Sequence, residues 1–451
     1  MVTRPAPEVP STAGRFTGTR GDGVLRFRGI RYATAARFEP PRPVALDPDA
    51  VVDATEAAPA CPQPRSRGDR MLGDPYRGIR FDEDCLRLSI TAPEDATPAS
   101  RLPVVVWIHG GSYVAGGGDL PIFDPAALVR EQGVIVVAVT FRLGIRGFLG
   151  DGRRVPPNLG LLDLVEALRW VRRHIADFGG DPSAVTLMGQ SAGGDAVVHL
   201  LVAAEGLFVR AVVQSAPLGI RRRRGRMTAR MLAAVGRIPP GASDELLDAA
   251  HDRAYAAARR FGLRSGMPFG PQYGFAPLPP EAAMDDAWRT AAPRVEVLIG
   301  WTAEETAFFG AISPVLSRLF TLPLVGTTVR SVLVRVTTDA VYRRDGRRFA
   351  RLLREAGGRV TEYELDWRPS GSAALAGHVT DLPLLFPDAG AWSGARLLGE
   401  EDPAALVRQG AGVRAVWGAF ARGEPLPRPA HGPVRLRLRG PAGTGSGSEH
   451  R

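Results

Sequence analysis

The chain has 451 residues, of which 45% are hydrophobic and 23% are charged, which is enough apolar material for one large domain or two ordinary ones. Its 53 glycines and 39 prolines argue against a helical bundle and suit a fold with many strand-to-helix turns. The formal charge is +10, but its arginines are scattered except in RRRRGR at 221–226, which we interpret as a solvated loop, so we expect no nucleic-acid partner.

Two absences bear on where the protein acts. The sequence has no run of 18 apolar residues, so we expect no transmembrane helix and no membrane anchor. The first sixteen residues, MVTRPAPEVPSTAGRF, lack the apolar segment of a secretory signal. We therefore expect a cytoplasmic protein.

Short apolar runs alternate with helical patterns along the chain. The runs LPVVVWIHGG and VIVVAVTF are almost wholly apolar, which is typical of strands buried on both faces. Such alternation predicts an α/β fold with a central, mostly parallel, twisted sheet flanked by helices. The predicted strands lie at 102–111, 134–141, 184–189, 210–216 and 294–301, and the predicted helices at 158–178 and 192–203.

The remaining segments set the predicted domain limits. Residues 217–290 and 310–375 are less regular and are expected to form a helical cap over the sheet edge. Residues 1–14 and 438–451 are polar and rich in small residues, so we expect loose tails there. The prediction is a single α/β domain over residues 15–437.

The stretch LMGQSAGGD contains the pattern G-x-S-x-G, with Ser191 between Gly189 and Gly193. It falls where a predicted strand meets a predicted helix. A nucleophilic serine must project from a tight turn at such a junction, and side chains two residues away on either side would collide with neighbouring elements. The pattern therefore favours Ser191 as a nucleophile over an ordinary loop serine.

A second loop, WIHGGSY, directly follows the predicted strand at 102–111. Backbone N–H groups of such a loop, together with the N–H after the nucleophile, can bind a developing oxyanion. The candidate donors are Gly110, Gly111, Ser112 and Ala192.

With both motifs in order, the chain resembles the type-B carboxylesterases, a family of α/β-hydrolases that includes cholinesterases and bacterial p-nitrobenzyl esterases. The matching stretches include FRGIRYATAARFEPPRP, EDCLRLSITAP, FGGDPSAVTLMGQSAGG and VWGAFARGEP, which together span about residues 20–430. The two predicted cap regions match poorly and are short for the family. The resemblance implies the α/β-hydrolase fold with a shortened helical cap region.

In such hydrolases the order along the chain is serine, acid, histidine. Position leaves His251 and His378 as candidates for the base. The resemblance selects His378, because the family's histidine precedes an acidic residue by three positions, as Asp381 follows here. For the acid, VLIGWTAEETAFF resembles the family's motif and implies Glu305, with its neighbour Glu304 as the alternative. The family's usual glycine after the acid is Thr306 here, so we expect a tighter or differently aimed turn.

Three further residues come from the same comparison. Cys61 and Cys85 correspond to the family's first disulfide pair and are expected to be a thiol pair able to form a disulfide. Many relatives carry glutamate immediately before the nucleophile, where this chain has Gln190. Because a carboxylate there would favour the imidazolium and attract cations, we expect no preference for cationic esters.

The predicted function is that of a serine carboxylesterase that hydrolyses small-molecule carboxylic esters through a Ser-His-Glu triad and an acyl-enzyme. The same triad could serve an acyltransferase, a lactonase or a carbamate hydrolase. A non-catalytic scaffold relative is a remote alternative, since such relatives lose the serine. No metal-ligand spacing is present, and we expect no cofactor. A monomer or small homo-oligomer is expected.

Overall fold

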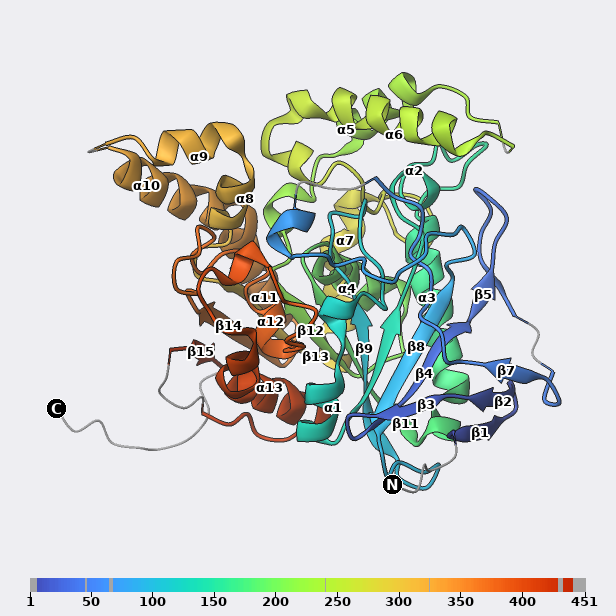
Figure 1. The fold of residues 1–451 in the computed structure, drawn as a ribbon. Coiled ribbons are helices and arrows are strands. Elements are labelled where there is room, and N and C mark those ends of the chain that lie inside the picture. The colour runs from blue at the N-terminus through green and yellow to red at the C-terminus, as the bar shows by residue number, and fades with distance from the viewer. Residues whose placement is uncertain are drawn as a thin grey trace.

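The computed structural model describes residues 6–44, 47–64, 68–239, 241–323, 325–428 and 433–440. Within these ranges a ten-stranded sheet forms the centre of the molecule (Figure 1). Its strands, in spatial order, are β15 (Arg435–Arg439), β14 (Val360–Asp366), β13 (Glu296–Thr302), β12 (Arg210–Gln214), β11 (Gly180–Gln190), β9 (Leu102–Ile108), β10 (Ile135–Val139), β8 (Arg87–Pro93), β4 (Val24–Arg31) and β3 (Thr19–Gly21).

The middle of this sheet is parallel and both of its margins are antiparallel. In spatial order, the six strands β14, β13, β12, β11, β9 and β10 run parallel. On one side β15 pairs antiparallel with β14, and on the other β8, β4 and β3 pair antiparallel in turn. Successive residues of β9 enter different halves of the core, because side chains alternate across a strand. Val104, Val106 and Ile108 pack into one apolar cluster, and Val105 and Trp107 into the other.

Helices cover both faces of the sheet. One face is covered by α3 (Leu159–His174), α4 (Ala192–Ala203), α7 (Met284–Ala291) and α11 (Arg344–Glu355). The other is covered by α1 (Ala126–Gln132), α12 (Leu382–Leu385) and α13 (Leu406–Arg422). Each helix buries an apolar stripe against the sheet, which is the usual reason that an amphipathic sequence folds as a surface helix.

Two groups of short helices lie beyond the carboxyl ends of the parallel strands (Figure 1). One contains α5 (Gly225–Val235) and α6 (Asp244–Ala258), with α2 (Gly144–Gly147) beneath them. The other contains α8 (Ala307–Ile312), α9 (Pro314–Phe320) and α10 (Gly326–Thr338), which project at the upper left. These groups form the cap. A small sheet of β1 (Glu8–Ser11), β2 (Gly14–Thr17) and β7 (Val51–Asp53), and the pair β5 (Ala33–Thr34) and β6 (Arg42–Pro43), complete the N-terminal region.

The structure confirms the predicted strands and helices of the central segment, with α4 at the predicted bounds of 192–203. The prediction that residues 310–375 belong wholly to the cap is wrong, because β14 within them is a strand of the central sheet and α11 packs on it. The alternation in β14 was hidden by its charged residues, which lie at the sheet's less buried margin.

The predicted tails also need correction. Residues 8–11 form β1 and pair with β2, so the predicted loose segment 1–14 is wrong there. At the other end β15 continues to Arg439, two residues past the predicted domain limit. Residues 1–5 and 441–451 lie outside the described residues.

Candidate active site

Ser191 lies at a sharp turn between β11 and α4. Its backbone is strained, with φ 59° and ψ −122°, and its N–H donates a hydrogen bond to the carbonyl of Gln214 at 2.8 Å. A Cβ on Gly189 would clash with the carbonyl of Gly193, and a Cβ on Gly193 would clash with the carbonyl of Ile108. The two glycines are therefore required by the close packing of strand, turn and helix, as the sequence pattern predicts.

The loop after β9 faces this turn. A Cβ on Gly110 would lie 3.1 Å from the Cβ of Ser191, and Gly111 has φ 112°, a conformation that other residues rarely adopt. Ser112 and the next residue, Tyr113, also have positive φ. Among the described residues, the N–H groups of Gly110, Gly111, Ser112 and Ala192 donate to no protein acceptor. The loop thus offers unpaired donors beside Ser191, the arrangement that an oxyanion hole needs.

His378 and Glu305 form a buried pair. The Nδ1 atom of His378 lies 2.6 Å from Oε2 of Glu305, and the N–H of His378 donates to the carbonyl of Glu305 at 2.9 Å. The other carboxylate oxygen of Glu305 accepts from the N–H of Thr302 at 2.8 Å. The alternative acid, Glu304, instead forms an ion pair with Arg368 at 3.2 Å and does not reach the histidine.

The Nε2 side of His378 faces the candidate nucleophile's neighbour. Its nearest hydrogen-bonding partner is the side-chain nitrogen of Gln190 at 3.4 Å. Within the described part of the chain, no hydrogen bond joins Ser191 to His378. Catalytic hydrogen bonds are commonly long in proteins without substrate, so the absence of a hydrogen bond between Ser191 and His378 is compatible with their acting together. The rings of Phe309 and Tyr342 each lie 5.3 Å from the imidazole and shield it from water.

Asp381 is buried close to His378 and Glu305. Burial, and secondarily the charge of Glu305, raise the pKa of the Asp381 carboxyl to about 6, while a hydrogen bond from Gln214 at 2.7 Å opposes the shift. A buried carboxyl of this kind is largely protonated in mildly acidic solution.

The turn after Glu305 differs from the sequence-based expectation. Thr306 has ordinary right-handed helical dihedrals (φ −79°, ψ −4°), so replacement of the usual glycine distorts nothing. Its hydroxyl lies 2.6 Å from the hydroxyl of Thr337 and donates to the carbonyl of Val334 at 3.1 Å. Thr306 therefore ties α10 to the segment that carries Glu305.

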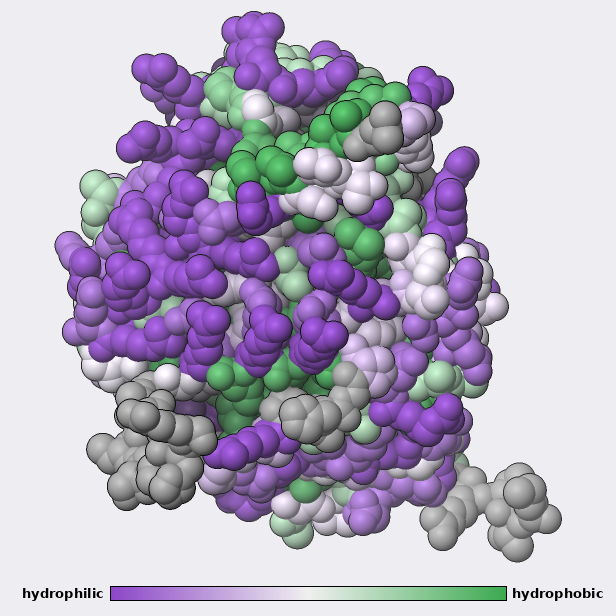
Figure 2. All heavy atoms as spheres, turned by 90° about the vertical axis from the view of Figure 1, so that its left-hand side faces the viewer, coloured by the Kyte–Doolittle hydropathy of each residue, from purple (hydrophilic) through white to green (hydrophobic). Residues whose placement is uncertain are grey.

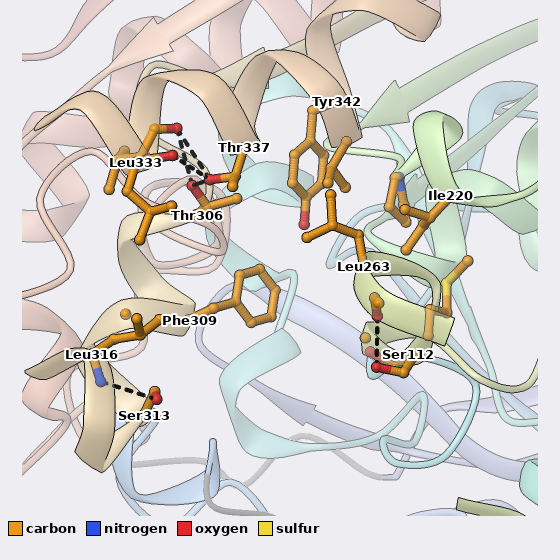
Figure 3. A pocket seen from close by; sticks show the side chains of 18 of the residues that line it. Ser112, Ile220, Leu263, Thr306, Phe309, Ser313, Leu316, Leu333, Thr337 and Tyr342 are labelled. Atoms are coloured by element: carbon orange, nitrogen blue, oxygen red, sulfur yellow. Dashed lines mark hydrogen bonds between the residues drawn. The ribbon is translucent and has the colours of Figure 1, made fainter. Parts of the chain in front are cut away.

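A cavity of about 640 Å³ opens over Ser191 (Figure 3). In Figure 3, Leu333 and Thr337 of α10 lie on one side of it and Ile220 and Leu263 on the other. Among the described residues, no charged side chain lines it. The lining residues are Ser112, Ser191, Pro217, Ile220, Gly262, Leu263, Ser265, Gly266, Met267, Thr306, Phe309, Gly310, Ser313, Leu316, Phe320, Leu333, Val334, Thr337, Val341 and Tyr342. Such a cavity suits an uncharged, largely apolar molecule.

A polar network that the sequence analysis missed holds the loop after β9 against α4. The Tyr113 hydroxyl donates to the carboxylate of Asp195 at 2.8 Å, and both side chains are buried. The neighbouring Arg224 is also buried and donates to the carbonyl of Pro268 at 2.6 Å. The only signal in the sequence is an aspartate inside a helix that is otherwise apolar except for His199.

The arginine run at 221–226 is not the predicted solvated loop. Arg221 is buried and stacks on the Trp288 ring at 4.3 Å, Arg222 forms an ion pair with Asp285, and Arg224 belongs to the network above. These side chains fix the start of α5 against the body of the protein.

Cys61 and Cys85 are buried next to each other, and both are free thiols with no disulfide between them. A hydrogen bond with Cys61 and burial raise the pKa of the Cys85 thiol. Across the described ranges, no group of three potential metal ligands is placed to hold an ion, and no helix is long and apolar enough to cross a membrane.

Comparison with known proteins places this geometry in a family. The sequence profile of the Carboxylesterase family matches residues 5–317. A probable N-octanoylanthranilate hydrolase of Rhodococcus erythropolis is 36% identical over 92% of this chain and 92% of its own. The para-nitrobenzyl esterase of Bacillus subtilis is 33% identical, over 84% and 82% respectively. Among solved structures, a thermophilic p-nitrobenzyl esterase superposes with a TM-score of 0.77 at 29% identity, covering 98% of this chain and 99% of that one.

Proposed function

The chain belongs to the carboxylesterase family and is a carboxylic ester hydrolase, and from that premise we propose that Ser191, His378 and Glu305 cleave neutral esters with an apolar acyl chain. The observation that carries the proposal is the meeting of a strained serine, a buried His–Glu pair and unpaired backbone donors at one end of an uncharged cavity.

In the proposed reaction His378 accepts the Ser191 proton as the hydroxyl attacks the ester carbonyl. Glu305 holds the imidazole by its Nδ1–H and stabilises the cation that forms. The oxyanion binds the N–H groups of Gly111, Ser112 and Ala192. The alcohol leaves with the proton from His378, and water activated by the same histidine then releases the acid.

The substrate class follows from the cavity. The name of one relative contains an octanoyl group, and a lining rich in leucine, valine and phenylalanine could hold an acyl chain of that kind. The same name contains an anthranilate, whose carboxylate would need a cation. In the part of the chain that the structure describes, no arginine or histidine lines the cavity. A buried unpaired charge is costly, so we expect neutral leaving groups to be preferred.

The test is active-site labelling together with hydrolysis of a substrate panel. Ser191→Ala should lose fluorophosphonate labelling and lower kcat by about 10⁴-fold or more. Ser265→Ala, a change in the same cavity, should keep the labelling and the kcat of the wild type. Octanoyl esters of a neutral phenol should be cleaved at least about tenfold faster than those of a carboxylated phenol. Labelling of Ser191→Ala at the normal rate would refute the assignment of the nucleophile. Equal rates for the two phenols would refute the substrate class alone.

A further inference from the structure

The hairpin of α9 and α10 exposes an unusual number of large apolar side chains. Val315 is 75% exposed, Val336 56%, Val325 52%, Leu322 48% and Val332 47%. Figure 2 shows hydrophobic surface gathered in the upper part of this face, where Figure 1 places α9 and α10. Contiguous apolar surface of this kind commonly marks a site of contact with another molecule or a membrane.

The exposed residues of α10 form a stripe. Val325, the residue just before the helix, recurs at helical spacing with Val332, Val336 and the half-buried Val329 on the outer side. The inner side carries Leu333, Val334 and Thr337, which line the cavity over Ser191. The helix is therefore apolar on both sides although only one side is covered by protein, so internal packing does not account for the outer stripe.

A groove of about 560 Å³ borders the stripe at Val336. It is lined by Arg335, Arg343, Arg344, Arg347 and Arg439, with Asp339 and Glu364 as its acidic residues. Arg343 forms an ion pair with Glu364, and Arg344 forms one with Asp339. Arginines exceed acids in the lining, so the groove is basic, and Figure 2 shows hydrophilic surface directly below the hydrophobic region.

We propose that the α9–α10 face docks on an anionic lipid–water interface, with its exposed apolar side chains, Val315 of α9 and the valine stripe, in the acyl region and the groove arginines at the headgroups. An apolar stripe beside a basic groove is the pattern of an element that lies in the plane of a membrane surface. The chain's net charge of +10 favours the same partner. A second copy of the chain would bring two basic grooves together and is disfavoured. Docking would place the wall of the cavity against a source of apolar esters, but it does not depend on the proposed reaction.

The test measures sedimentation of the full chain with vesicles. Vesicles of phosphatidylcholine mixed with phosphatidylglycerol should bind roughly tenfold or more tightly than vesicles of phosphatidylcholine alone. Raising the salt to about 0.5 M should weaken this binding, because ions screen the headgroup attraction. Equal binding to both vesicle types, or no binding to either, would overturn the proposal.

Two pairs of variants separate the apolar and basic parts of the face. Val315→Asp should weaken vesicle binding several-fold, whereas Val51→Asp, equally exposed at 74% on β7, should not. Arg344→Gln should weaken binding to the anionic vesicles, whereas Arg42→Gln should not. Both arginines are highly exposed and each is paired with a nearby acid on its own segment. Circular dichroism should show the same melting temperature for all four variants and the wild type. Equal binding by the members of either pair would refute the role given to that part of the face.

Light scattering on the same samples without vesicles tests the competing occupant. The wild type and Val315→Asp should have the same mass in solution. A larger mass for the wild type, together with unchanged vesicle binding by Val315→Asp, would mean that a second copy covers the face and that the lipid proposal is wrong.

Discussion

Gln190 stands beside the candidate nucleophile and closest to the free nitrogen of His378, at 3.4 Å. Its amide carries no charge, so the imidazolium formed during the proposed reaction has one carboxylate partner, Glu305, in hydrogen-bonding contact. A carboxylate in its place would stabilise the protonated ring directly. The residue therefore sets the electrostatic environment of the base without taking part in the hydrogen bond to the acid.

We expect Gln190→Glu to move the acidic limb of the pH–rate profile upward by about one pH unit, because the base would lose its proton at higher pH. The same variant should raise the relative rate on cationic esters such as choline esters. The measurement is kcat/KM from pH 5 to 9 for a neutral and a cationic ester.

Gln190→Met serves as the control, since it removes the amide and adds no charge. It should leave the midpoint where it is in the wild type. A shift of the same size in both variants would show that the amide contact, and not the charge, controls the profile.

At the scale of single elements, the sequence is sufficient to predict a strand or helix wherever the segment has one structural role. The buried parallel strands read as continuous apolar runs, and α4 was predicted to the residue. Strand β14 was missed because half of its side chains are polar and it lies next to the sheet margin, where one face packs and the other is wet. The cap helices could not be assigned, because their packing depends on contacts with distant segments.

The site shows the same division. Ser191, His378 and Glu305 carry local motifs and were predicted as a set, and the structure brings His378 and Glu305 together. The tie between Tyr113 and Asp195 joins residues 82 positions apart and leaves no local pattern. Contacts of this kind appear only when the fold is known.

Helix α10 depends on one such contact, the hydroxyl cluster around Thr306. We expect Thr306→Val to lower the free energy of unfolding by about 1 kcal/mol, since it removes the hydroxyl contacts to Thr337 and Val334. Because α10 forms one wall of the cavity, KM for octanoyl esters should rise more than kcat falls. Urea unfolding and steady-state kinetics measure the two effects.

Thr321→Val is the matched control for this prediction. Thr321 follows α9 in the same cap, but its hydroxyl is exposed and bonds to the carbonyl of Arg318. Its effect should stay within about 0.5 kcal/mol, with KM unchanged. Equal effects of the two variants would mean that the Thr306 cluster does not hold the helix in place.

At the scale of the whole molecule, buried histidines make the fold sensitive to mild acid. Burial lowers the pKa of His109 to about 4 and also lowers the pKa values of His199 and His251. For each ring, the loss of hydration on burial outweighs the interactions that favour the charged form. His109 stacks on Phe141 at 4.6 Å, and His251 stacks on Phe269 at 4.9 Å. The folded state therefore binds protons at these histidines less readily than the unfolded chain, where their ordinary pKa is about 6.5.

The sign of the effect follows from which state binds more protons. Below about pH 6.5 the unfolded state takes up protons at these histidines more readily than the folded state does, so stability falls as the pH falls. Asp381 and Asp119 act in the opposite direction, because burial raises the folded-state pKa of both carboxyls above the ordinary 3.8, to about 6 for Asp381, and the folded state holds the extra protons. The three buried histidines outnumber these two carboxyls. We therefore expect the free energy of unfolding to fall as the pH drops from 6.5 to 5, with up to about 1.4 kcal/mol per pH unit coming from His109 alone.

Two variants should change this slope in opposite directions. His251→Phe keeps an aromatic ring against Phe269 and removes one titrating group, so its stability should fall less steeply with acid. Asp381→Asn can still accept the hydrogen bond from Gln214 and removes one of the two opposing groups, so its stability should fall more steeply. Urea unfolding at pH 6.5, 5.75 and 5 measures the slopes. This range lies below the ordinary histidine pKa of about 6.5 and includes the folded-state pKa of Asp381, about 6. Parallel slopes for both variants and the wild type would mean that other groups control acid stability, since the two changes have opposite predicted signs.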